Sequence, residues 1–202
     1  MRGRLFTVIL AGFLVGALGG AGALVLTRGG SGPKVETSGK ALIGGPFTLI
    51  DQNGKTVTDE DFRGKYMLVF FGFTHCPDIC PAELQVMAAS LNELGDKAAE
   101  VVPIFITLDP ERDTPQVMGD YVKNFGRKFI GLTGSPGAIA AAAKAYRVTY
   151  SKFEYKDVDG NYGYSVDHSA FAYLMGPDGE YIAHFNYGIP VTTMTDTLRR
   201  YL

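Results

Sequence analysis

The chain has 202 residues, of which 46% are hydrophobic and 20% charged, which is enough apolar material for the core of one domain. Its 19 basic residues nearly balance its 21 acidic residues, giving a net charge of −2. The sequence has no basic patch of the kind that would indicate nucleic-acid binding. The sequence has no internal repeat, and its only two cysteines are where any thiol or soft-metal chemistry must occur.

The N-terminal residues are predicted to form a membrane anchor. Arg2 and Arg4 precede an uncharged run from Leu5 to Leu26, which as a helix would span roughly 33 Å and could cross a bilayer core of about 30 Å. The basic residues place the N-terminus in the cytoplasm or the mitochondrial matrix. A removed signal peptide is the alternative, because Ala21-Gly22-Ala23 resembles a cleavage site. We expect residues 1–28 to be a single-pass inner-membrane anchor, with the globular part in the oxidising periplasm or intermembrane space.

Two further features concern the region around this anchor. Gly12, Gly16 and Gly20 recur every four residues, a spacing that can form a packing face for a second transmembrane helix and hence a homodimer. Glycine is also common in membrane helices that have no such role. Residues 29–45 are rich in glycine and serine and lack periodicity, which indicates a flexible linker. A single globular domain is then expected over residues 46–202.

The first elements of this domain lead toward the cysteines. Asn53-Gly54, between the segments 47–50 and 55–58, predicts a short hairpin. The continuous apolar run 67–71 predicts a strand that is covered on both faces. Apolar residues at helical spacing predict a helix over 82–95.

The two cysteines lie between this strand and this helix, in the segment Phe73-Thr74-His75-Cys76-Pro77-Asp78-Ile79-Cys80-Pro81. The carboxyl end of a buried strand is where open α/β sheets usually place their sites. Residues four apart share one face of a helical turn, so the two sulfur atoms can close a disulfide or bind one metal ion. A helix N-terminus also lowers a thiol pKa, and the thiolate is the form that attacks disulfides and binds metals. A structural disulfide, a redox-active pair and a metal site all remain open on spacing alone.

The rest of the chain alternates strands and helices. The apolar run 101–108 predicts a second strand parallel to the first, and Thr114-Pro115 and Ser135-Pro136 are start signals of two helices. Turn residues then separate two hairpins, and a last helix follows Pro190; the predicted hairpin strands are 148–156 with 162–166, and 171–175 with 180–185. This order predicts an α/β, thioredoxin-like domain with an inserted hairpin.

Three histidines are candidate ligands, although a lone histidine is more often structural. His168 is the strongest candidate, because it stands just before the predicted strand 171–175, which we expect beside the cysteine-bearing strand. Asp167 could fix the tautomer of His168. His75 adjoins Cys76, but adjacent residues rarely point the same way. His184 lies in mid-strand without chemical neighbours and is predicted to be structural.

A polar segment, Asp109 to Thr114, follows the second parallel strand and should lie on the same rim as the cysteines. We interpret it as a helix start, capped by Asp113 or Thr114, with Arg112 in a local ion pair. Contact with a partner protein is the alternative.

Three motifs in this order resemble the Sco/SenC family, the copper chaperones of cytochrome c oxidase assembly: the cysteine segment above, Asp109-Pro110-Glu111-Arg112-Asp113-Thr114, and Asp167-His168-Ser169 followed by residues 173–179. The resemblance runs through residues 46–202 and includes the anchored N-terminus. It implies that one copper ion binds through Cys76, Cys80 and His168, with Asp78 and Asp167 as candidate contacts of these ligands. The implied partner is cytochrome c oxidase subunit II, whose dinuclear copper site would receive the metal. Another copper carrier or a thiol-disulfide reductant is the further partner that we expect.

The chemistry of these side chains agrees with that implication. Two thiolates suit Cu(I), and an added imidazole makes a site that also accepts Cu(II). Oxidation to a Cys76–Cys80 disulfide would destroy the site. The competing function is a thiol-disulfide oxidoreductase that reduces the cysteines of the target site. Such enzymes usually have Cys-x-x-Cys and a proline facing it, whereas here three residues separate the cysteines and His168 takes the place of the proline.

Overall fold

The structure is a computed structural model that describes residues 42–126, 129–156 and 158–202. Its contacts divide the chain into residues 1–40 and a compact unit of residues 41–202. The predicted anchor, its Gly12, Gly16 and Gly20 face, and most of the predicted linker lie outside the described residues. Within the described part, no helix combines the length and the apolar character that a membrane crossing requires.

A mixed sheet of seven strands forms the centre of the domain, in the order β2-β1-β5-β4-β3-β8-β9. Its strands are β1 (Thr48–Asp51), β2 (Thr56–Thr58), β3 (Tyr66–Gly72), β4 (Val101–Thr107), β5 (Ile130–Thr133), β8 (Phe171–Met175) and β9 (Tyr181–Asn186). β3 pairs in parallel with β4, as the sequence predicts. It also lies beside β8, as expected, and the structure shows that this pairing is antiparallel. The β1–β2 and β8–β9 hairpins are also confirmed. The cysteine-bearing strand is therefore central, with its apolar side chains buried on both faces.

Strand β5 was not expected from the sequence. It has four residues and pairs in parallel with β4 and antiparallel with β1. Its Gly131 is packed closely by α3, since a Cβ there would lie 3.2 Å from Cβ of Met118. A run this short, with glycine in it, shows no alternation that could identify it.

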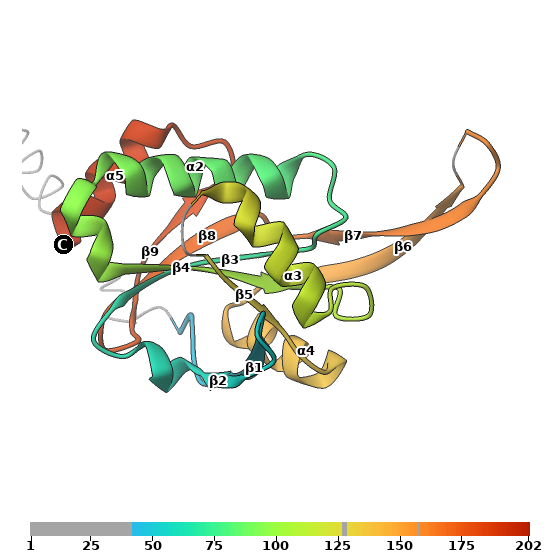
Figure 1. The fold of residues 1–202 in the computed structure, drawn as a ribbon, viewed down its shortest axis with the longest axis horizontal. Helices are drawn as coiled ribbons and strands as arrows, with labels where there is room; N and C mark the ends of the chain where they lie inside the picture. The colour runs from blue at the N-terminus through green and yellow to red at the C-terminus, as the bar shows by residue number, and fades with distance from the viewer. Residues whose placement is uncertain (1–41, 127–128, 157) are drawn as a thin grey trace, which may run out of the picture. The chain divides into compact units, whose positions relative to one another are not determined.

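Helices cover both faces of this sheet (Figure 1). They are α2 (Ile79–Glu93), α3 (Pro115–Val122), α4 (Pro136–Ala145) and α5 (Val191–Tyr201), with short 3-10 segments at Asp59–Phe62, Gly95–Glu100 and Lys123–Phe125. Side-chain contacts place α2 and α3 over one face of β3 and β4, because Cys80 lies against Gly72 and Tyr121 against Phe105. α5 packs beside α2, whereas Tyr146, at the end of α4, contacts Phe71 on the opposite face.

The start signals of two helices are confirmed in detail. Thr114 accepts a hydrogen bond from the backbone N–H of Val117, and Ser135 accepts one from that of Ala138. α2, however, begins at Ile79, three residues before the predicted start. Its first turn therefore contains Cys80.

The inserted hairpin is formed by β6 (Tyr150–Lys156) and β7 (Tyr162–His168), which pair only with each other among the described strands. It projects from the body of the domain as a two-stranded arm (Figure 1). Most β6 side chains are exposed, including the aromatic rings of Phe153 and Tyr155. β7 runs to His168, two residues beyond the predicted end, so His168 stands where the arm joins the domain.

Residues 42–45, assigned from the sequence to the linker, contact the domain. The Gly44 N–H donates to the Ala145 carbonyl, and Arg147 Nε donates to the Leu42 carbonyl at 3.1 Å. Ile43 packs against the hydrophobic core. The ordered domain thus includes four residues before Pro46.

Candidate metal centre

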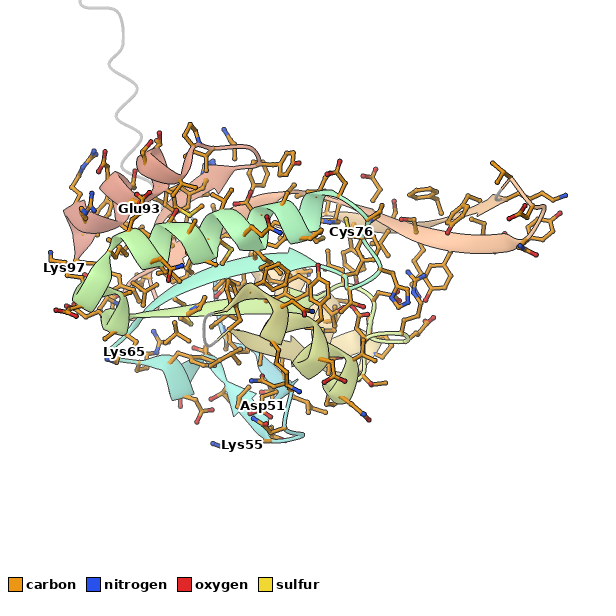
Figure 2. All side chains as sticks on the ribbon, turned by 45° about the horizontal axis from the view of Figure 1, so that its top comes forward. Asp51, Lys55, Lys65, Cys76, Glu93 and Lys97 are labelled. Atoms are coloured by element: carbon orange, nitrogen blue, oxygen red, sulfur yellow. The ribbon has the colours of Figure 1, made fainter. Side chains whose placement is uncertain are left out.

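The two cysteines lie where β3 ends and α2 begins, and Figure 2 shows Cys76 at the end of α2 that is directed toward the β6–β7 arm. Cys76 is partly exposed, whereas Cys80 is completely buried, and both are free thiols. The N–H of Cys80 lies 3.4 Å from Cys76 Sγ. Cys76 precedes α2 and therefore lies in the loop before the helix, not in a helical turn shared with Cys80 as the spacing had suggested. Its sulfur nevertheless lies at the helix N-terminus, where the thiol and N–H of Cys80 are its neighbours.

Cys76 lies in an environment that favours its thiolate. A hydrogen bond from the Cys80 thiol, together with the backbone N–H groups of Cys80, Asp78 and Ile79, lowers the pKa of Cys76 from 9.0 to about 5, against the opposing effect of burial. The hydrogen bond to Cys76 and burial raise the pKa of Cys80 well above its ordinary value. In the metal-free protein one thiol is thus an accessible nucleophile and the other a protected donor.

We expect this asymmetry to appear in the pH dependence of thiol alkylation. Iodoacetamide should label Cys76 of the reduced, metal-free protein at a rate that is constant from pH 6 to pH 8 and falls below pH 5, because a lowered pKa keeps the thiolate present above that pH. Cys80 should stay unlabelled until the protein unfolds. The Cys76→Ser variant is the control and should show no rapid labelling. A rate for Cys76 that climbs through pH 8, as for a free thiol with a pKa of about 8.5, would contradict this expectation.

The Cys80 sulfur is held against the backbone of β3. A Cβ added to Gly72 would lie 2.5 Å from Cys80 Sγ and 3.0 Å from the Phe105 ring. Glycine is therefore required at the end of β3, because any side chain there would occupy the position of the sulfur.

His168 approaches the cysteines from the arm. Its Nε2 lies 3.7 Å from Cys80 Sγ, and its Nδ1 lies 3.0 Å from the Ser169 carbonyl oxygen. A carbonyl can only accept, so Nδ1 donates in that contact, and in the neutral imidazole Nε2 is then the nitrogen with the lone pair beside the sulfur. The rings of Phe70 and Phe73 contact the imidazole edge-on, with centroids 6.2 and 6.0 Å away.

The predicted partners of the ligands act differently from expectation. The acceptor that fixes the His168 tautomer is the Ser169 carbonyl rather than Asp167. Successive residues of a strand point to opposite faces, and Asp167 is exposed beside its cross-strand partner Ser151. Asp78 contributes its backbone N–H to the Cys76 sulfur, and its side chain makes no cap hydrogen bond to α2.

The sequence did not lead us to place Asp113 at this centre. Its buried carboxylate accepts hydrogen bonds from the Thr74 N–H at 3.0 Å, from Thr74 Oγ1 at 2.6 Å and from Thr107 Oγ1 at 2.6 Å. It holds the cysteine loop onto the end of β4, and Thr114 alone caps α3. The predicted local ion pair of Arg112 is present, with Asp109.

The other two histidines have different surroundings. His75 Nδ1 lies 3.1 Å from Thr74 Oγ1 and 3.8 Å from Asp113 Oδ1. His184 Nδ1 lies 2.6 Å from the Tyr181 hydroxyl, within β9.

Across the described residues, no three histidine, cysteine, aspartate or glutamate side chains are already arranged as a metal cluster. The structure brings the candidate ligands together in two pairs, which are Cys76 with Cys80 and Cys80 with His168.

A comparison with protein families matches residues 35–202 to the SCO1/SenC model. The chain belongs to the SCO1/SenC family. A curated relative, SCO1 homolog 1 of Arabidopsis thaliana, mitochondrial, is 48% identical over 161 residues, covering 79% of this chain and 47% of the relative. An SCO2-like protein of Rickettsia prowazekii is 42% identical over 173 residues, covering 82% of this chain and 83% of that protein. The chain thus spans about half the length of the first of these relatives.

Solved Sco structures have the same fold. Arabidopsis thaliana ScoI with copper bound superposes with a TM-score of 0.73 at 46% identity, covering 79% of this chain and 97% of that one. Bradyrhizobium japonicum ScoI with copper bound gives 0.71 at 45% identity, covering 79% and 99%. A further match, BsSco, is a Sco-family member of the cytochrome c oxidase assembly proteins in which a disulfide switch was identified; it gives 0.61 at 26% identity, covering 79% and 94%. The predicted α/β, thioredoxin-like domain is confirmed.

Proposed function

We propose that this SCO1/SenC protein is a membrane-tethered copper carrier. Cys76, Cys80 and His168 bind one Cu(I) or Cu(II) ion, and the protein delivers it to the dinuclear copper site of cytochrome c oxidase subunit II. The single observation that carries the proposal is the 3.7 Å distance between His168 Nε2 and Cys80 Sγ, two candidate donor atoms that are 88 residues apart in the sequence. Two relatives of the same fold have copper bound, and BsSco belongs to a family of oxidase assembly proteins.

The donor set fits a copper ion that is carried rather than kept. Two sulfur donors and one imidazole nitrogen suit both oxidation states of copper, whereas a structural zinc site normally has four protein ligands. Cys76 is partly exposed, so an incoming ligand can reach the metal. The curated relatives from Arabidopsis thaliana and Homo sapiens are mitochondrial, which fits an anchor in the inner membrane with the domain in the intermembrane space or, in bacteria, the periplasm.

Copper titration of the reduced and the oxidised protein tests this function. The reduced protein should bind one copper per domain, and the Cys76–Cys80 disulfide form should bind none at this site, because the disulfide removes both thiolate donors. In the reduced His168→Ala variant, Cu(I) should still bind, while Cu(II) should lose its nitrogen-ligand spectroscopic signature, because Cu(II) prefers more ligands and harder donors. His184→Ala is the matched control. Undiminished binding after verified oxidation, or an unchanged Cu(II) spectrum of His168→Ala, would contradict the assignment.

The thiol asymmetry favours a second candidate, a reductase of the target cysteines. A low-pKa, accessible Cys76 beside a buried Cys80 is suited to attack a partner disulfide and then to resolve the mixed disulfide. Copper transfer from the loaded protein to the copper domain of subunit II, set beside turnover of a disulfide in that domain, separates the two. In cells lacking the gene, rescue of oxidase by added copper would favour delivery over reduction.

A further inference from the structure

The structure raises the question of what holds His168 at its short distance from Cys80. His168 is the last residue of β7, and the arm to which it belongs is a separate two-stranded sheet. Backbone pairing with the central sheet therefore does not fix the arm. The Ser169 carbonyl and the rings of Phe70 and Phe73 contact the imidazole itself, and side-chain contacts further along the arm add to these in placing it.

Several contacts of the arm come from the segment that follows β4. The Tyr164 hydroxyl donates to the Asp109 carboxylate, with oxygen separations of 2.9 and 3.3 Å. The Arg112 guanidinium lies 3.8 Å from the centroid of the Tyr164 ring, and Arg112 Nη1 donates to the Tyr164 carbonyl at 3.1 Å. Arg112 is in turn ion-paired with Asp109. One tyrosine of β7 is thus held through its hydroxyl, its ring and its backbone.

The other strand of the arm is held to the same segment. Lys152 Nζ lies 2.7 Å from the Glu111 carboxylate and 3.6 Å from that of Asp109. Exposed ion pairs contribute little by themselves. Asp109, in contrast, is completely buried, and a buried carboxylate needs the donors that surround it.

The same five residues, 109–113, also hold the cysteine loop. Asp113 accepts from the N–H and hydroxyl of Thr74, two residues before Cys76. The segment itself is a closed turn, because the Asp113 N–H donates to the Asp109 carbonyl at 3.0 Å. One short segment therefore joins the loop that carries the two thiols to the arm that carries the imidazole.

The geometry points to a new role for this segment: we propose that Asp109, Arg112 and Tyr164 form a clamp that positions His168 relative to Cys80. Tyr164 and His168 are four residues apart in one strand, so they lie on the same face of β7. Holding Tyr164 fixes the tilt of the arm, and that tilt sets the separation of Nε2 from the sulfur. The proposal rests on the proposed copper site, because it states what positions the nitrogen ligand. These are positioning residues, which act on the metal only through His168.

The Tyr164→Phe variant tests the clamp. It removes the hydroxyl that binds Asp109 and keeps the ring beneath Arg112. We expect its Cu(II) affinity to fall about 10-fold, the lower end of the effect of removing residues that orient metal ligands. Its Cu(I) affinity should stay at the parent value, because the two thiolates are not displaced. Tyr162→Phe is the matched control, since Tyr162 lies on the same face of the same strand and is 80% exposed.

A double-mutant comparison decides whether the effect passes through His168. In the His168→Ala background, Tyr164→Phe should change Cu(II) binding no further, because the residue on which the clamp acts is gone. An equal loss in both backgrounds, or no loss in either, would overturn the proposal. Asp109→Asn is a second variant with the same expected pattern, should Tyr164→Phe fail to fold.

A readout without metal separates failure of the clamp from failure of the copper site. The His168 ring lies edge-on to Phe70 and Phe73, so its NMR resonances depend on its position relative to those rings. Tyr164→Phe should shift them in the reduced, metal-free protein, and Tyr162→Phe should not. Shifted resonances in a protein that binds no copper would refute the proposed function and keep the clamp. Normal copper binding with unshifted resonances would refute the clamp alone.

Discussion

Replacing Cys80 with serine is expected to lower the Cu(I) affinity of the reduced protein by more than about 100-fold, because changes to residues that only orient ligands already cost 10- to 100-fold. The Cys80 thiol contacts both other candidate donors, so its loss leaves Cys76 and His168 without their shared neighbour. A serine hydroxyl is a poor ligand for soft Cu(I). Competition against a Cu(I) chelator measures the change.

The control for that experiment is Ala88→Ser, which adds a hydroxyl at a buried position two turns further along the same helix. It should lower the free energy of unfolding while leaving Cu(I) affinity at the parent value. Full Cu(I) affinity in Cys80→Ser would remove Cys80 from the proposed site.

Replacing Gly72 with alanine should damage the fold and the candidate metal centre together. The new methyl group would lie 2.5 Å from Cys80 Sγ and 3.0 Å from the Phe105 ring, and both are completely buried. Overpacking of a core costs about 1 to 3 kcal/mol of unfolding free energy. The sulfur must also move away from its position beside His168, so we expect weaker Cu(I) binding in addition to the lower stability. Urea denaturation and Cu(I) competition measure the two effects.

A matched glycine shows whether the contact or the loss of glycine is responsible. Gly137 lies in the first turn of α4, where an added Cβ would meet no atom from the rest of the protein within 4 Å. Gly137→Ala should therefore raise the unfolding free energy, by up to about 1 kcal/mol, because alanine is the better helix residue. Unchanged stability of Gly72→Ala would show that Cys80 is not held against β3 as described.

The sequence is informative wherever a local pattern has one physical cause. The apolar run 67–71 predicts the central strand, because only a strand covered on both faces lacks polar positions. The N-cap signals at Thr114 and Ser135 are equally local, since each involves a side chain and an N–H three residues away. The position of the cysteines at the end of β3 follows from these elements.

Prediction stops where distant segments determine the result. The early start of α2 was missed because Pro81 looks like a boundary, yet a proline in the first turn costs no intrahelical hydrogen bond. The hydrogen bond from Thr74 to Asp113 joins residues 39 positions apart, and no local sequence pattern predicts such a contact. The Ser169 carbonyl that fixes His168 is a backbone atom, which composition cannot reveal.

In the proposed copper site, the unequal burial of the two sulfur atoms would set the order in which the two copper–sulfur bonds are exchanged. Of the two sulfur atoms, a receiving protein can approach only that of Cys76, because Cys80 is enclosed by α2 and β3. In the proposed site, the copper bond to Cys76 would then be exchanged before the copper bond to Cys80. The rate of copper transfer would depend on how strongly the first ligand of the acceptor competes with Cys76. Cys80 would keep the ion bound to the protein until a second acceptor ligand has bound.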